Sequence, residues 1–143
     1  MLLREEYRQR LTKEYRYAAT KMQEATQPAK KLFYFSIFFG EAQRVLNWEW
    51  DRELVLINMV TQQVYTQIKN TAENPAYGIL PIEWSTIYEK LSKAASDLAT
   101  YSEKAENDDS QDELIQILGR LAEIAYATIG NGSYLYEKGT FKL

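Results

Sequence analysis

The densest group of residues that could do chemistry lies between residues 47 and 53, Asn-Trp-Glu-Trp-Asp-Arg-Glu. Glu49 and Glu53 are four residues apart, so on a helix both carboxylates would face the same way. Mg²⁺ and Mn²⁺ prefer carboxylate oxygens, but a site of this kind needs further acids from a second helix. Because no other acid stands at a spacing that points to this pair, we favour an acidic helix start flanked by two tryptophans.

A second acidic run, Glu103-x-x-Glu106-x-x-Asp109, lies near the middle of the second half of the chain. All-α nucleotide pyrophosphohydrolases bind Mg²⁺ with carboxylates at related spacings. Here the acids fall at a predicted helix end and in a loop, and not on two facing helices, so a solvated loop is the interpretation that we favour. A carboxylate- and Mg²⁺-dependent nucleotide hydrolase is the second alternative function.

The 143 residues include no histidine and no cysteine. These two absences remove most general acid–base, nucleophilic and transition-metal chemistry. The sequence also has no glycine-rich phosphate loop. We therefore expect a protein that is not an enzyme, with no catalytic residue, no bound cofactor and no metal.

Aromatic and basic side chains supply the candidate binding residues. The chain has 11 Tyr, 5 Phe and 3 Trp, and residues 1–31 carry eight basic and four acidic side chains. Interleaved aromatic and basic residues can stack bases and hold phosphates, so a nucleic-acid-associated subunit using the first helix is the first alternative function. Acids interrupt the basic run, which favours a solvated helix face instead. The candidate interaction residues are Tyr7, Arg8, Tyr15, Arg16, Trp48, Trp50 and Arg52.

Apolar residues recur at spacings of three and four along most of the chain, which predicts an all-α fold. We expect a single-domain bundle over residues 1–143, with about five main helices and a short C-terminal helix or extended tail at Ser133–Leu143. The predicted helices cover Leu2–Gln27, Ala29–Leu46, Trp48–Thr71, Pro81 to the acidic loop at 107–109, and the Ser110-Gln111-Asp112-Glu113 capping box to Gly130-Asn131-Gly132.

Four details of this bundle can be checked directly. Asn47 is expected to cap the third helix, and the second and third helices are expected to form a central hairpin. Phe35 and Phe39 lie on one apolar stripe of the second helix, so both are expected in the core. Gly40, in the same helix, is expected to mark a close crossing.

The aromatic content and the broad apolar faces of the second and third helices predict a helical interaction or assembly protein, most simply a homodimer. A further protein partner is compatible with the same surfaces. The most apolar stretch is about eight residues long, whereas a membrane span needs about 20. With no secretory signal pattern at Met1–Glu6, we expect a soluble, cytoplasmic protein without a membrane partner.

Overall fold

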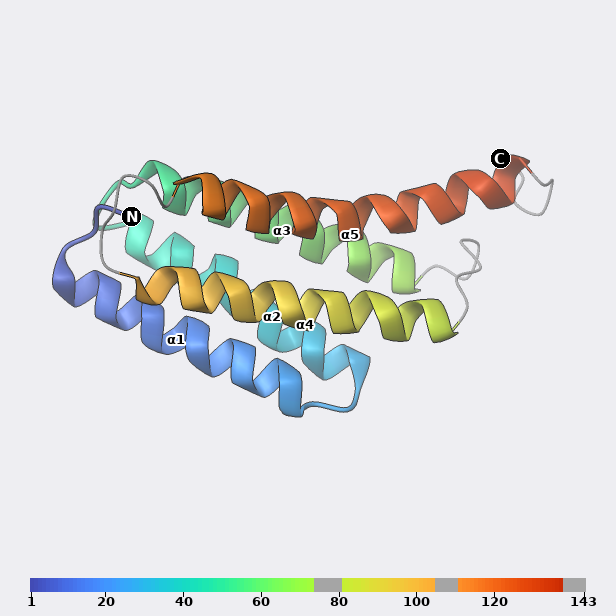
Figure 1. The fold of residues 1–143 in the computed structure, drawn as a ribbon, viewed down its shortest axis with the longest axis horizontal. Helices are drawn as coiled ribbons and strands as arrows, with labels where there is room; N and C mark the ends of the chain where they lie inside the picture. Colours follow the sequence, from blue (N-terminus) through green and yellow to red (C-terminus); the bar gives the residue numbers. More distant parts are fainter. Residues whose placement is uncertain (74–80, 105–110, 138–143) are drawn as a thin grey trace.

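A computed structural model of the chain describes the backbone of residues 1–73, 81–104 and 111–137, and the side chains of 1–71, 84–104 and 112–128. The described part is all-helical, as predicted. Figure 1 shows five helices, which are α1 (Glu5–Glu24), α2 (Pro28–Leu46), α3 (Arg52–Glu73), α4 (Pro81–Glu103) and α5 (Gln111–Glu137). No described helix is long and apolar enough to cross a membrane.

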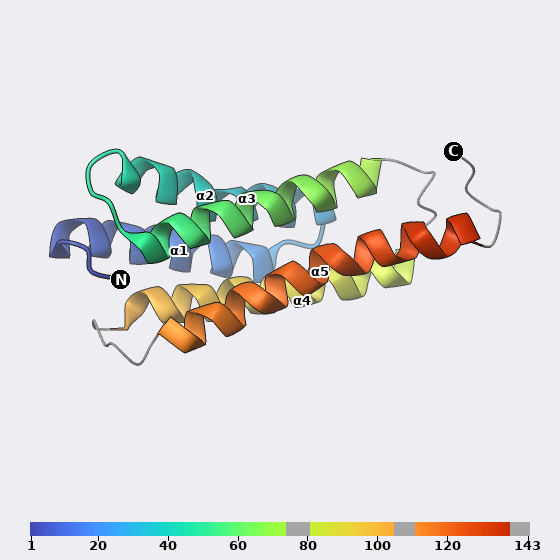
Figure 2. The same cartoon turned by 90° about the horizontal axis from the view of Figure 1, so that it is seen from above.

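The helices run alternately in opposite directions and pack as a bundle around one apolar core (Figures 1 and 2). The neighbouring pairs are α1 with α2, α2 with α3, α3 with α5, α5 with α4, and α4 with α1, and α2 also touches α4. The predicted hairpin of α2 and α3 is present, but α3 is not central. α2 and α4 each have three helical neighbours, while α3 has only two, which leaves its outer side without a neighbour.

The start of α3 differs from the prediction. Asn47 ends α2, and its backbone N–H donates to the carbonyl of Gln43 (3.2 Å). The true cap of α3 is Asp51, whose Oδ1 accepts from the backbone N–H of Leu54 (2.9 Å). A carboxylate is a good N-cap because it satisfies an otherwise unpaired N–H and complements the helix dipole.

The first residues of the chain are not helical, although the prediction began the first helix at Leu2. The backbone N–H of Leu2 donates to Asp51 Oδ2 (2.9 Å), and that of Arg4 donates to Glu49 Oε2 (3.2 Å). Leu3 is buried between these two contacts. The acids of the α2–α3 turn thus accept from N–H groups at the start of the chain, which would have no carbonyl partner in a longer α1 either.

The end of α5 also differs, because the helix continues through Gly130-Asn131-Gly132 to Glu137. Glycine lowers helix propensity by about 1 kcal/mol but does not forbid the helical conformation. The expected separate element at the start of the tail is therefore part of α5. Residues 138–143 lie outside the described part of the chain, and so does Ser110 of the predicted capping box.

Two expectations for α2 are wrong. Phe35 is fully buried as predicted, but its buried companion is Phe38, while Phe39 is only half-buried against Tyr65. The buried face of α2 is rotated slightly from the predicted stripe, so Phe38 takes the place of Phe39 in the core. A Cβ added at Gly40 would meet nothing within 4 Å, so this glycine marks no close crossing within the chain.

Candidate interaction surfaces

The predicted residues at the α2–α3 turn form an aromatic and cationic cluster with α1. The rings of Tyr7 and Trp48 stack with their centroids 5.7 Å apart and their planes at 16°. The guanidinium carbon of Arg10 lies 5.3 Å from the centroid of Trp48. Arg10 also donates from Nε to Oε1 of buried Glu41 (2.6 Å). Much of this cluster is therefore committed to joining α1 to the end of α2.

Trp50 and Arg52 lie beside this cluster with exposed side chains. Trp50 is 75% exposed, the highest value among the large hydrophobic residues of the described chain. Arg52 is exposed at the first position of α3. Trp48, although stacked on Tyr7, is itself 54% exposed, so two exposed tryptophans lie at this turn. They are compatible with partner binding, but exposed apolar residues are also common in monomeric proteins.

Tyr15 is fully buried, so it lies in the core and not on an accessible surface. Its hydroxyl donates to the carbonyl of Phe38 (2.8 Å), and the two rings are in contact at 4.6 Å. Burial, and to a smaller extent the charge of Glu41, raises the pKa of the Tyr15 phenol well above its ordinary value. Tyr15 is a structural link between α1 and α2.

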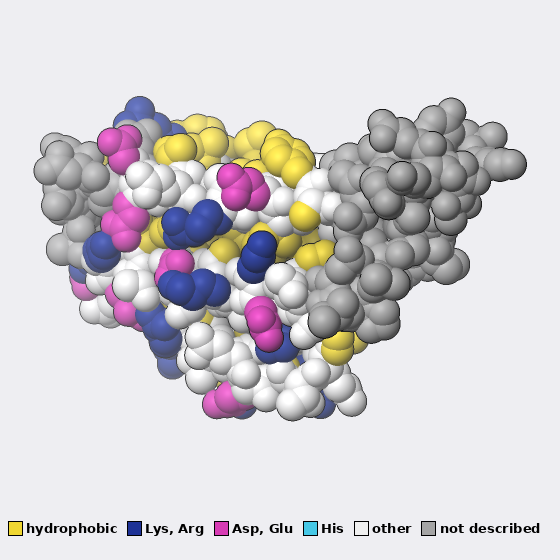
Figure 3. Space-filling view, turned by 45° about the vertical axis from the view of Figure 1, so that its right-hand side comes forward, with side chains coloured by type: hydrophobic (Ala, Val, Ile, Leu, Met, Phe, Trp, Pro, Cys, Tyr) yellow, Lys and Arg dark blue, Asp and Glu magenta, His cyan; other side chains and the backbone are white. Residues whose placement is uncertain are grey.

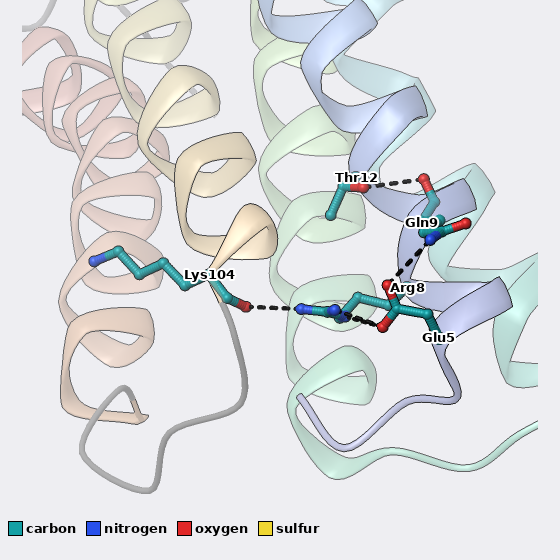
Figure 4. Close-up of polar contacts among 5 residues, drawn as sticks. All are labelled: Glu5, Arg8, Gln9, Thr12 and Lys104. Atoms are coloured by element: carbon teal, nitrogen blue, oxygen red, sulfur yellow. Dashed lines mark hydrogen bonds and ion pairs between the residues drawn. The ribbon is translucent and has the colours of Figure 1, made fainter.

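Arg8 and Arg16 join α1 to the end of α4. Figure 4 shows Arg8 between Glu5 and the backbone carbonyl of Lys104, with Nε 3.2 Å from Glu5 Oε2 and Nη1 3.5 Å from that carbonyl. The hydrogen bond from Arg8, and then that from Gln9, lowers the pKa of Glu5. Arg16 donates from Nε to Glu103 Oε1 (2.7 Å).

The basic character of the N-terminal segment is therefore partly balanced by ion pairs. Arg8, Arg10, Arg16 and Lys21 each lie in an ion pair with a carboxylate. Four of the eight cationic side chains of residues 1–31 are thus paired. Phosphate binding depends on accessible positive charge, so this pairing makes a nucleic-acid interface on α1 less favourable.

The carboxylates of Glu49 and Glu53 hold the N-terminal residues in place. Glu49 precedes α3, so it does not share a helix face with Glu53. Oε2 of Glu53 lies 2.9 Å from the amino group of Met1 and accepts from the hydroxyl of Tyr101 (2.8 Å). Among the described residues, no three His, Cys, Asp or Glu side chains group closely enough to hold a metal ion. Most of the second acidic run, residues 105–109, lies outside the described part.

An apolar surface covers the outer side of the α3–α5 pair. Met59 is 61% exposed, Ile115 50% and Tyr126 66%. Gly119 is also exposed, and Ala122 is half-buried. A groove of about 290 Å³ runs between the two helices, with Met59 on one side and Ala122 and Tyr126 on the other. We call these five residues the α3–α5 face; Figure 3 shows apolar side chains along the upper edge of the molecule, where α5 lies in Figure 1.

The sequence analysis did not find this face, although a signal for it exists. The prediction assigned the apolar residues of the fifth helix to a single stripe that includes Leu114, Leu121 and Thr128, all of which are buried. A second stripe at i, i+4, i+7 and i+11 begins at Ile115 and ends at Tyr126. An α5 with apolar residues on two sides would have indicated a helix that meets more than its own bundle.

A different groove separates α4 from α5 on the side shown in Figure 3, with a volume of about 490 Å³. Its floor includes Ile87 and Ile124, and basic side chains stand along the apolar strip. Asp97 accepts from Lys93 (2.7 Å) and from Arg120 (3.1 Å) and neutralises part of this charge. The rim of this groove carries charged side chains, whereas the polar lining of the α3–α5 groove consists of uncharged groups such as the amides of Gln63 and Gln67.

The comparisons with known proteins do not assign this arrangement to a family. No protein-family model, no curated protein and no solved structure matches the chain. The case for a function therefore depends on the surfaces described above.

Proposed function

We propose that the chain is a non-enzymatic helical interaction and assembly protein that associates with copies of itself. The single observation that carries the proposal is the α3–α5 face. Its five residues include three large exposed apolar side chains and no charged one. Contiguous exposed apolar patches are uncommon on monomeric soluble proteins unless they bind a partner.

The other surfaces fit this role less well. The Trp48 cluster contains Arg10 and buried Glu41, and the α4–α5 groove has charged side chains at its rim. Charged residues are depleted at the cores of protein–protein interfaces, because removing an unpaired charge from water is costly. The groove of the α3–α5 face has the amides of Gln63 and Gln67 in its lining but no charged side chain, so no charge would have to leave water there.

Self-association can be tested with two differently tagged copies of the chain that are mixed and purified through one tag. We expect the copy that carries the other tag to be recovered with the wild-type protein. The double variant Met59→Gln/Tyr126→Gln should recover much less, because it places amides in the apolar face while leaving the buried side of both helices intact.

Phe33→Gln is the matched control, since Phe33 is similarly exposed but lies on α2. We expect the control to behave as wild type. Equal recovery for the double variant and the wild type would place the contact elsewhere. Recovery of no second copy in any sample would contradict self-association and leave a different protein partner to be sought.

A further inference from the structure

The outward stripe of α5 has a spacing that reads the same in both directions. Ile115, Gly119, Ala122 and Tyr126 are separated by four, three and four residues. At 3.6 residues per turn they fall within about 60° of arc, so they form one narrow ridge. The large residues stand at the two ends of this ridge and the small ones at its centre.

A two-fold axis at the centre of this stripe would pair it with itself. In an isologous interface, if residue i contacts residue j of the partner, j contacts i. For two antiparallel copies of α5, this rule pairs Ile115 with Tyr126 and Gly119 with Ala122. The small central residues then let the two backbones approach, while the large end residues pack over the neighbouring helix. We propose that this antiparallel α5–α5 contact is the dimer interface; the inference rests on the proposed self-association and names its geometry.

The neighbouring helix places one more residue at the same centre. Gln67 Nε2 donates to Thr128 Oγ1 (3.3 Å), and α3 and α5 run in the same direction (Figure 1). Both helices rise about 1.5 Å per residue, so Met59, eight residues before Gln67, lies level with position 120. Met59 therefore stands beside Gly119 and Ala122, close to the proposed axis, where it meets Met59 of the second copy.

Gly119 leaves room for this contact. A Cβ added there would meet no atom within 4 Å, so the fold itself does not require glycine. A glycine inside a helix costs about 1 kcal/mol relative to alanine. A close approach by a helix of a second copy supplies a reason for retaining it.

The area available is compatible with a weak dimer. The described side-chain range of α5, from 112 to 128, spans about 26 Å, and two adjacent helices are about 20 Å wide. Burial of the whole outer surface of this helix pair, including polar side chains outside the five-residue face, would cover about 500 Å² on each copy, or about 1,000 Å² in all, which is the lower limit for a specific interface. We therefore expect association in the micromolar range and not a permanent dimer.

The absence of cysteine allows the register to be tested by disulfide formation. Ile115→Cys and Tyr126→Cys are prepared separately, mixed and oxidised mildly. The mixture should form a covalent heterodimer, because the two positions face each other in the antiparallel pair. Ile115→Cys alone should not, since its own copies would lie about 16 Å apart along the helix, beyond the about 7 Å limit for a disulfide. Mixing Gly119→Cys with Ala122→Cys tests whether the centre of the stripe lies at the contact and removes less apolar surface.

Gly119→Leu provides a second test that does not depend on oxidation. The side chain points into open space in the single chain, so the bundle should fold. At the proposed contact it would hold the helices apart, and we expect the dissociation constant to rise about tenfold to a hundredfold. Gly40→Leu, at the other open helical glycine, is the matched control and should change the dissociation constant by less than about twofold.

The outcomes separate the two proposals. Heterodimers from both mixtures, with none from Ile115→Cys alone, support the antiparallel contact. Self-linking of Ile115→Cys would instead show parallel helices. A dimer seen by light scattering with no cross-link in either mixture would overturn the α5 contact but preserve self-association. A wild-type monomer at every concentration would overturn the proposed function itself.

Discussion

At the scale of single residues, Tyr15 makes stability depend on pH in a definite direction. Its pKa is raised in the folded chain, so the folded state keeps a phenolic proton that the unfolded chain releases above about pH 10. Stability from this group is therefore complete below that pH and is lost as the pH rises further. Tyr88, which is also buried, has a raised pKa and acts in the same sense.

Tyr15→Phe isolates this effect. The variant loses the hydrogen bond to the Phe38 carbonyl and should be less stable by about 1 kcal/mol at neutral pH. It should also lose less stability than wild type between about pH 9 and pH 11. Denaturant unfolding at several pH values provides the comparison. Parallel losses in both proteins would show that Tyr15 does not control the alkaline limit.

Arg10 is the second residue with a measurable role, because it neutralises a buried carboxylate. Glu41 is 3% exposed and accepts from Arg10 Nε at 2.6 Å, whereas Arg44 Nη1 lies 3.4 Å away. Arg10→Gln should cost about 2 kcal/mol, less than a fully buried pair would lose, since Arg10 itself is half-exposed. Lys13→Gln on the same helix is the control and should change stability by less than about 0.5 kcal/mol. Chemical denaturation measures both, and equal effects would remove the special role of the pair.

At the scale of helices, α2 gives the clearest test of core packing. Phe35 and Phe38 are fully buried, so Phe35→Ala and Phe38→Ala should each cost about 3–5 kcal/mol. Phe39 is half-buried against Tyr65. Phe39→Ala should therefore cost only about 1–2 kcal/mol, because less of the ring leaves water on folding. Thermal melts of the three variants would rank them, and a Phe39 variant as unstable as the other two would contradict the helix rotation described here.

Gly40 offers a stabilising change in the same helix. Alanine at this position would meet no neighbouring atom and would lower the entropy of the unfolded chain. Gly40→Ala should therefore raise the free energy of unfolding by about 0.5–1 kcal/mol. A fall in melting temperature would mean that the helix needs glycine there for a contact that the single chain does not contain.

The helices themselves could be predicted from periodicity, and Pro81 correctly marked the start of α4. Several of their ends could not, and distant groups contribute at the starts of α1 and α3. Asp51 replaced Asn47 as the cap of α3 while its other oxygen bound the N–H of Leu2, a contact 49 residues apart in sequence. Local rules do not contain such long-range hydrogen bonds.

The candidate site was less predictable than the fold. Residue type marked Tyr15 and Trp48 as candidate interaction residues. Tyr15 is fully buried, whereas Trp48 is stacked on Tyr7 and still 54% exposed. Met59 and Tyr126 were exposed by an arrangement that leaves α3 with only two helical neighbours. Which apolar stripe faces outward depends on how all five helices pack.

At the scale of the whole molecule, the missing histidines predict a flat response near neutral pH. The chain has no side chain of the type that ordinarily titrates between about pH 6 and pH 8. The melting temperature and the degree of self-association should therefore vary little across this window. Thermal melts and light scattering at several pH values measure these two quantities. A steep change in either would indicate a strongly perturbed carboxylate or lysine and count against a purely structural role.

Self-association is the central claim, and the molar mass of the pure chain measured by light scattering over a wide concentration range tests it most directly. One chain has a mass of 16.7 kDa. We expect the weight-average mass to rise from this value towards that of a dimer through the micromolar range, and to stay nearer the monomer value for Met59→Gln/Tyr126→Gln. A wild-type mass that remains at the single-chain value at every concentration would contradict the account.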